Sequence, residues 1–221
     1  MSKRVLASVA LVALALMCIG LLWLDLPLAR WVHDSGLAAS PLMVGSIGVL
    51  DTIFGVKLSY WLASSLCIVV GTALLVISRN RLRYRLPGQT LVSVALVQAS
   101  TNLLMILGKN TFGRVRPVDL LASTDWSAMW FMGGGSFPSG HGAFYFGLLL
   151  PLAASTSRIW LRTLLLGIAV FVVLARINME RHYLSDVCAS ALIAACVALT
   201  LRALLQQFKA TAVPAVATAT R

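Results

Sequence analysis

Long apolar stretches, separated by short basic or Gly- and Pro-containing segments, constrain this chain more than any other feature. The first, Val5 to Leu24, contains twenty almost uniformly apolar residues. As an α-helix it would be about 30 Å long, the thickness of the hydrocarbon core of a bilayer. Five further stretches follow, at 58–78, 90–108, 141–155, 163–177 and 184–204. The sequence therefore predicts an all-α polytopic membrane protein with six transmembrane helices, folded as a single domain over residues 1–221.

The composition agrees with a bilayer environment. Hydrophobic residues make up 59% of the chain and charged residues 11%, and the mean hydropathy is +0.90, which is too apolar for an ordinary soluble domain. The net charge of +11 would favour nucleic acid in a soluble protein. Here the basic residues cluster between apolar stretches, so no nucleic-acid partner is expected. The four cysteines lie inside apolar stretches and lack zinc-site spacing, so they are expected to be packing residues.

Four further features of the sequence give more limited predictions. The first stretch has a competing interpretation as a signal peptide, but its apolar core exceeds the usual length of about 7–15 residues, so a retained helix is expected. Residues 25–57 mix polar residues with Pro and Gly, which predicts an interfacial segment with short amphipathic helices. The tail, 206–221, lacks a clear pattern and is expected to be disordered. Four polar residues at mid-depth of the third stretch are expected to form hydrogen bonds between helices: Gln98, Ser100, Thr101 and Asn102.

The distribution of charge predicts an orientation. Six spans place both termini on one side of the membrane, and eleven of the eighteen basic residues fall on that side, which the positive-inside rule makes cytoplasmic. All seven acidic residues fall on the other side. Five of the seven basic residues there lie in two short segments, 109–117 and 175–186. We therefore expect a multi-pass protein of the plasma membrane, in bacteria the inner membrane, with a functional site facing the periplasm or outside.

The segment FPSGH, residues 137–141, directly precedes the fourth stretch. Ser139, Gly140 and His141 would then lie in the first turn of a helix, where unpaired N–H groups and the helix dipole favour an anion. Three cationic residues from the two basic segments are expected on the same face: Lys109, Arg116 and Arg176. Cationic donors around a helix N-terminus are what a transferring phosphoryl group needs.

Two histidines are candidates for the chemical steps. His182 and Asp186 are four residues apart at the start of the sixth stretch, so they share a helix face. The carboxylate is then expected to hold the imidazole through Nδ1–H, which leaves Nε2 free to attack phosphorus. His141 is the candidate general acid and base. The alternative, that the three clusters are separate structural features, requires all three to fall by chance on one face of the membrane.

These motifs resemble those of the type 2 phosphatidic acid phosphatase superfamily, which also includes bacterial acid phosphatases and vanadium haloperoxidases. The family pattern is lysine, six residues and Arg-Pro; then Pro-Ser-Gly-His; then Ser-Arg, five residues, His, three residues and Asp. The chain meets it from Lys109 to Asp186 except at Ala175, where the family usually has serine. That departure removes one supporting hydrogen bond, typically about 1 kcal/mol, and no chemical role.

The resemblance implies an all-helical core with the catalytic site at the extracytoplasmic face of the membrane, in a motif core of residues 109–186. A phosphohistidine would form on His182, oriented by Asp186, and His141 would activate the water that releases phosphate. Five residues would hold the phosphoryl group: Lys109, Arg116, Ser139, Gly140 and Arg176. No metal and no other cofactor is implied. Three charged neighbours match no family role and are candidate headgroup contacts: Arg114, Asp119 and Glu180.

Several functions remain open at this point. The first is a lipid phosphatase acting on a phosphate or pyrophosphate headgroup, such as undecaprenyl pyrophosphate, phosphatidylglycerophosphate, phosphatidic acid or lipid A. The second is a lipid phosphotransferase with the same site, and product analysis would distinguish the two. A transporter or other non-enzymatic membrane protein is less favoured, because the charges lie at the ends of spans. A haloperoxidase is disfavoured because the chain offers no soluble domain. The expected partner is a lipid phosphate, and no obligate protein partner is implied.

Overall fold

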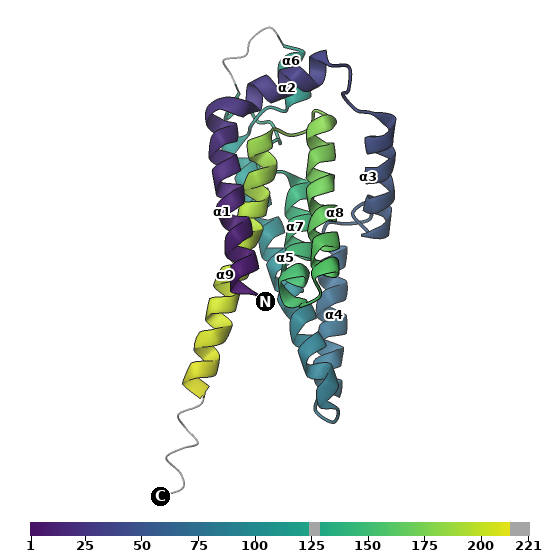
Figure 1. The fold of residues 1–221 in the computed structure, drawn as a ribbon, viewed down its shortest axis with the longest axis vertical. Coiled ribbons are helices and arrows are strands. Elements are labelled where there is room, and N and C mark those ends of the chain that lie inside the picture. Colours follow the sequence, from purple (N-terminus) through teal and green to yellow (C-terminus); the bar gives the residue numbers. More distant parts are fainter. Residues whose placement is uncertain (124–128, 213–221) are drawn as a thin grey trace, which may run out of the picture.

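The computed structural model describes residues 1–123 and 129–212 of the chain, without the side chains of 209–212. Within these residues the regular structure is entirely helical, as predicted (Figure 1). The α-helices are α1 (Lys3–Ile19), α2 (Asp25–Asp34), α3 (Pro41–Ile53), α4 (Leu62–Ile77), α5 (Arg85–Phe112), α6 (Pro117–Leu121), α7 (Gly140–Ser155), α8 (Ile159–Asn178) and α9 (Leu184–Ala212). A π-helical turn, Gly20–Leu24, joins α1 to α2.

The helix α7 forms the centre of the bundle (Figure 1). It packs against α1, α5, α8 and α9, and thirteen of its sixteen residues are buried. A Cβ atom on Gly142 would lie 2.9 Å from Cβ of Ser190, so glycine allows the start of α7 to approach α9. Because α7 is apolar on all sides, it is stable only inside a bundle or a membrane. Its first turn, which carries the PSGH motif, is therefore held from several directions.

The shorter helices and turns lie towards the two ends of the bundle. Figure 1 shows α2 and α6 across one end, with α3 standing beside α8, which it contacts. The turn between α4 and α5 marks the opposite end. The N-terminus packs nearer this second end, since Ser2 N–H donates to the Ala154 carbonyl (2.6 Å) and Arg202 NH1 to the Met1 carbonyl (2.7 Å).

Four helical segments of the described chain are long and apolar enough to cross a membrane: Lys3–Asp34, Leu82–Leu121, Ile159–Asn178 and Leu184–Phe208. The predicted second and fourth spans correspond to α4 and α7, which have sixteen residues each. Sixteen residues reach only about 24 Å as a helix. The predicted number of six spans is therefore not confirmed. The shortfall has a local cause, since α7 begins only at the motif turn and α4 is separated from α3 by residues 54–61.

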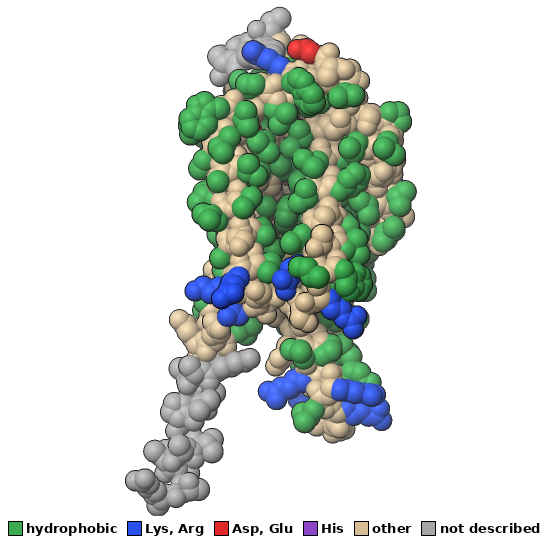
Figure 2. All heavy atoms as spheres, in the orientation of Figure 1, with side chains coloured by type: hydrophobic (Ala, Val, Ile, Leu, Met, Phe, Trp, Pro, Cys, Tyr) green, Lys and Arg blue, Asp and Glu red, His purple; other side chains and the backbone are tan. Residues whose placement is uncertain are grey.

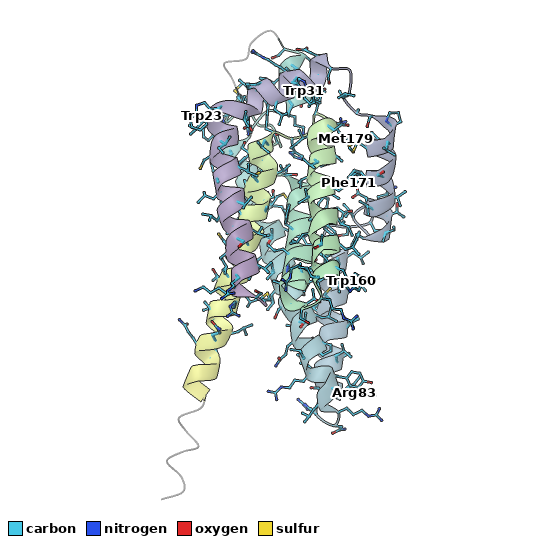
Figure 3. All side chains as sticks on the ribbon, in the orientation of Figure 1. Trp23, Trp31, Arg83, Trp160, Phe171 and Met179 are labelled. Atoms are coloured by element: carbon cyan, nitrogen blue, oxygen red, sulfur yellow. The ribbon has the colours of Figure 1, made fainter. Side chains whose placement is uncertain are left out.

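The surface has the features of a membrane protein. Figure 2 shows hydrophobic side chains over the middle of the molecule, with most of the visible Lys and Arg side chains below them. Two exposed tryptophans, Trp23 (67% exposed) and Trp31 (60%), lie near α2, and another, Trp160 (59%), lies near the start of α8, between them and Arg83 (Figure 3). In membrane proteins tryptophan is enriched where the membrane meets water, and Lys and Arg are enriched in the cytoplasmic loops.

The C-terminal segment differs from the prediction. The helix α9 continues to Ala212, so the prediction of disorder is wrong for residues 206–212. The chain from Leu204 to Lys209 contains good helix formers, and no Gly or Pro follows until Pro214. Residues 213–221 lie outside the described part of the chain.

The polar residues of α5 behave differently from one another. Asn102 bonds to another segment, since its Nδ2 donates to the Tyr60 carbonyl oxygen at 2.8 Å. The Thr101 hydroxyl instead donates to the Val97 carbonyl of its own helix at 2.7 Å, and the amide of Gln98 has no partner among the described residues. Asn102 therefore bonds to the turn before α4, and among the described residues the predicted hydrogen bonds from Gln98, Thr101 and Asn102 to another helix are not found. The bond from Asn102 fixes the segment between α3 and α4 against α5.

Candidate active site

The two cations of the first motif lie side by side where α5 ends. Gly113, in the left-handed conformation (φ 49°), closes α5 and turns the chain, and a Cβ atom there would lie only 2.9 Å from the backbone N of Gly133. Lys109, in the last turn of α5, donates from Nζ to the Gly135 carbonyl. A Cβ atom on Gly135 would lie 3.8 Å from Lys109 Nζ and 3.9 Å from Arg116 NH2. Both cations therefore flank the same glycine.

The PSGH motif forms the start of α7 and is tied to α9. Ser139 is the N-cap, and its Oγ accepts the Gly142 N–H at 3.2 Å. The N–H of Ser139 donates to the Asp186 carbonyl (3.1 Å), and its own carbonyl accepts from Ser190 Oγ (2.8 Å). The N–H groups of Gly140 and His141 have no intrahelical acceptor, because they belong to the first turn. These two donors, rather than the N–H of Ser139, are left for an anion.

His182 is oriented by a different group from the one predicted. Its Nδ1 lies 2.8 Å from the Ser136 carbonyl oxygen, whereas the nearest Asp186 oxygen is 3.6 Å away. A carbonyl only accepts, so Nδ1 carries the proton and Nε2 keeps its lone pair. Asp186 acts one step away, since its Oδ2 accepts from Ser136 Oγ (2.6 Å) and the Tyr183 N–H (2.8 Å). The geometry thus agrees with the predicted tautomer of His182, with the proton on Nδ1. The predicted direct hydrogen bond between His182 and Asp186 is not formed.

Burial sets the charge of His182. The side chain is 4% exposed, and this burial lowers the pKa of His182 to about 4, against an opposing effect of the Asp186 carboxylate. The imidazole is therefore neutral near pH 7. A neutral ring with Nδ1 protonated is the form that attacks through Nε2.

Arg114 was predicted to be a headgroup contact, and this prediction is wrong. The side chain is instead buried and supports Asp186. It is 1% exposed, and its guanidinium donates to Asp186 Oδ1 (2.6 Å) and Asp25 Oδ2 (2.7 Å). Its centre lies 4.4 Å from the ring of Trp130 and 3.9 Å from the ring of Tyr183. The role was not visible in the sequence, because its two carboxylate partners are 72 and 89 residues away. Arg114 thus connects the start of α2 to the catalytic aspartate.

Glu180 is also placed differently from the prediction. It is 7% exposed, and its Oε1 lies 2.9 Å from Nδ1 of His33 on α2. Asp119 is exposed on α6, so it alone of the three remains a candidate for a headgroup contact.

Replacing Arg114 by Met is expected to lower both stability and activity. The change leaves Asp25 and Asp186 buried without their cation, which typically costs about 3–5 kcal/mol and would lower the thermal midpoint by roughly 10 °C. Phosphatase activity is expected to fall by about 10–100-fold through loss of Asp186 orientation. Thermal unfolding and initial rates in detergent measure both effects. Arg83→Met, at the far end of the molecule (Figure 3), is the control, and equal behaviour of the two variants would contradict the assigned role.

The three cations of the motifs, Lys109, Arg116 and Arg176, have no carboxylate partners among the described residues. Arg176, in the last turn of α8, is half-buried like Lys109 and Arg116. Within the described residues no carboxylate oxygen lies within 4.0 Å of any of the three. The Nε atoms of Arg116 and Arg176 are buried without a hydrogen-bond partner there. Such a concentration of positive charge and free donors suits a phosphoryl dianion.

His141 is held at both ring nitrogens by residues that the motifs do not include. Its Nε2 lies 3.0 Å from Asp51 Oδ2, and its Nδ1 lies 3.1 Å from the Tyr60 hydroxyl. Neither contact could be predicted, because Asp51 and Tyr60 lie in a segment with no recognisable spacing to the motifs. Among the described residues, no group of three His, Cys, Asp or Glu side chains is placed to hold a metal ion.

Comparison with known proteins agrees with this geometry. A family model described as the PAP2 superfamily matches residues 86–210, which is more than half of the chain and contains all three motifs. No curated protein and no solved structure matches the chain. The match supports a phosphatase that acts on phosphate esters. The resemblance of the motifs is thus confirmed, and the chain belongs to the PAP2 superfamily, the superfamily of the type 2 phosphatidic acid phosphatases.

Proposed function

We propose that the protein is an integral-membrane lipid phosphatase that removes a phosphate or pyrophosphate headgroup through a phosphohistidine on His182. One observation carries this proposal: three cations that have no carboxylate partner among the described residues accompany the first turn of α7 and the neutral, Nδ1-protonated His182. The set supplies charge, backbone donors and a nucleophile, which are the requirements of phosphoryl transfer.

The reaction proceeds in two steps. In the first, Nε2 of His182 attacks phosphorus, the bond to the leaving oxygen breaks, and His141 gives that oxygen a proton. The charge that develops on the phosphoryl oxygens is stabilised by the cations Lys109, Arg116 and Arg176 and by the N–H groups of Gly140 and His141, since the N–H of Ser139 is bonded to the Asp186 carbonyl. In the second step His141 takes a proton from water, which attacks phosphorus and releases His182. The Ser136 carbonyl stabilises the Nδ1–H of His182 throughout. The donors around the phosphoryl group are cations and N–H groups, so the mechanism needs no metal.

The surroundings of the site favour a lipid substrate. The apolar surface and the exposed tryptophans Trp23, Trp31 and Trp160 fit a protein that lies across a membrane. In this proposal α4, together with α3, and the central α7 complete six spans. Arg79, Arg81, Arg83 and Arg85 lie around the turn between α4 and α5, at the end away from the site, so both termini are cytoplasmic and the site faces the periplasm or outside. A soluble phosphate ester would not need a site at that position.

The assay that tests the proposal is phosphate release by the purified full-length protein from a panel of lipids in detergent. The panel contains phosphatidic acid, phosphatidylglycerophosphate, lipid A and undecaprenyl pyrophosphate, each with excess chelator present. We expect free phosphate from at least one lipid, undiminished by chelator and inhibited by vanadate, which imitates pentacoordinate phosphorus. Dependence on a divalent ion would exclude the metal-free mechanism. A doubly phosphorylated lipid product instead of phosphate would indicate a phosphotransferase.

A further inference from the structure

The helix α3 contributes a buried carboxylate to the active site. Asp51 is 8% exposed, although α3 is otherwise an apolar helix at the edge of the bundle with exposed residues such as Leu42 and Ile53. Its Oδ2 accepts from His141 Nε2 at 3.0 Å, and its Oδ1 accepts from the Tyr145 hydroxyl at 2.9 Å. A charged group in an apolar helix is costly and is retained mainly where it serves a function.

Tyr60 approaches the same histidine from the other side. Its hydroxyl lies 3.1 Å from His141 Nδ1, and its ring packs edge-on against His141 and Phe144, each with centroids 5.9 Å apart. The buried amide of Asn102 on α5 holds the Tyr60 backbone. A Cβ atom on Gly140 would lie 3.5 Å from the Tyr60 hydroxyl, so this hydroxyl also borders the phosphate-binding turn.

The closer of the two histidine–carboxylate contacts in the site therefore belongs to His141. Asp51 lies 3.0 Å from His141, whereas Asp186 lies 3.6 Å from His182, whose Nδ1 bonds a backbone carbonyl instead. A carboxylate only accepts, so Nε2 of His141 carries a proton and is engaged by Asp51. The remaining nitrogen, Nδ1, faces Tyr60 and the phosphate-binding turn.

We infer that Asp51 and Tyr60 are positioning residues for the general acid His141, so that residues 41–61, outside the segment matched by the family model, complete the active site. Asp51 holds Nε2–H and supports the imidazolium form. Nδ1–H then transfers its proton to the leaving oxygen as the P–O bond breaks, and Nδ1 regains a proton from water when the phosphohistidine is hydrolysed. Tyr60 keeps the ring in the plane that aims Nδ1 at the phosphoryl group. This inference rests on the proposed role of His141.

The test measures whether Asp51 acts through His141. Asp51→Asn and Tyr60→Phe are compared with wild type on phosphatidic acid and on nitrophenyl phosphate, whose leaving group needs almost no proton. We expect Asp51→Asn to lower turnover of the lipid by about 10–100-fold and Tyr60→Phe by about 3–10-fold, while the single-turnover formation of nitrophenol changes by less than about threefold. In a His141→Ala background, Asp51→Asn should cause no further loss, because the two residues act as a unit. Asp34→Asn, an exposed carboxylate on α2, is the control.

The outcomes separate this inference from the proposed function. If His141→Ala itself shows no dependence on the leaving group, the role of His141 is wrong. The inference about Asp51 is wrong if His141→Ala depends on the leaving group and Asp51→Asn does not. It is also wrong if Asp51→Asn lowers activity in the His141→Ala background as much as in the wild type. Thermal unfolding checks that each variant is folded. If Asp51→Asn does not fold, Tyr60→Phe, which keeps the ring contacts, decides the question by the same comparison of substrates.

Discussion

His182→Ala is expected to abolish phosphate release from every substrate, by at least about 10⁴-fold. Without Nε2 of His182 no covalent intermediate forms, whatever the leaving group. The same variant should give no burst of product in pre-steady-state experiments with excess substrate. No phosphorylated protein should be recovered after a rapid quench in alkali. The measurement is made on the full-length protein in detergent, with a lipid phosphate and with nitrophenyl phosphate.

The third histidine provides a matched control for this prediction. His33 lies on α2, its side chain is 54% exposed, and it pairs with Glu180 outside the site. His33→Ala should therefore keep turnover within about threefold of wild type, as for most surface substitutions. A burst of product that survives in His182→Ala would assign the nucleophile to another residue. Loss of activity accompanied by unfolding would be recognised from the thermal midpoint, and His182→Asn, closer in shape, would then be the variant to assay.

The sequence predicted the helical class and the motif residues well, because both depend on local patterns. Long apolar stretches predict helices whatever their neighbours, and the observed α7 begins at Gly140, within one residue of the prediction. The number of membrane spans was harder, because a helix of sixteen residues, such as α4 or α7, is short for a membrane crossing although its stretch of sequence is apolar. A break in the chain, such as residues 54–61, divides one apolar length into two short helices without changing its composition.

The contacts that support the motif residues could not be predicted, because they join distant parts of the chain. Asp51 and His141 are 90 residues apart, and Asp25 and Arg114 are 89 apart. Both carboxylates come from the first quarter of the chain, which has no motif of its own. The one signal available was the presence of an acidic residue beside or within an apolar stretch, where a charge is costly unless it is paired. The sequence shows that such a residue needs a partner but not which one.

The backbone partner of His182 was missed for a related reason. Any carbonyl can accept from Nδ1–H, and backbone atoms leave no trace in residue types. The spacing of His182 and Asp186 made the carboxylate the natural candidate, but Asp186 Oδ2 is occupied by Ser136 Oγ and the Tyr183 N–H. Asp186 therefore holds Tyr183, the residue that follows the histidine, and Ser136, whose carbonyl in turn holds the imidazole ring.

His141→Ala is expected to distinguish substrates by their leaving groups. An alkyl alkoxide leaves poorly without a proton, whereas a nitrophenolate hardly needs one. General acid catalysis contributes about 10²–10⁴-fold, so this variant should lose that factor in turnover of a lipid phosphomonoester. Formation of the phosphohistidine from nitrophenyl phosphate should be much less affected, because His182 and the three cations are unchanged.

The second half-reaction makes this prediction sharper. His141 also activates the water that hydrolyses the phosphohistidine, so the intermediate should accumulate in His141→Ala. Stopped-flow absorbance with nitrophenyl phosphate should then show a burst of nitrophenol close to one per enzyme, followed by slow turnover. Adding His182→Ala should remove the burst, which ties it to the nucleophile. Equal losses on both substrates without a burst would contradict this division of roles, and they would indicate that His141 binds the phosphoryl group rather than transferring protons to and from it.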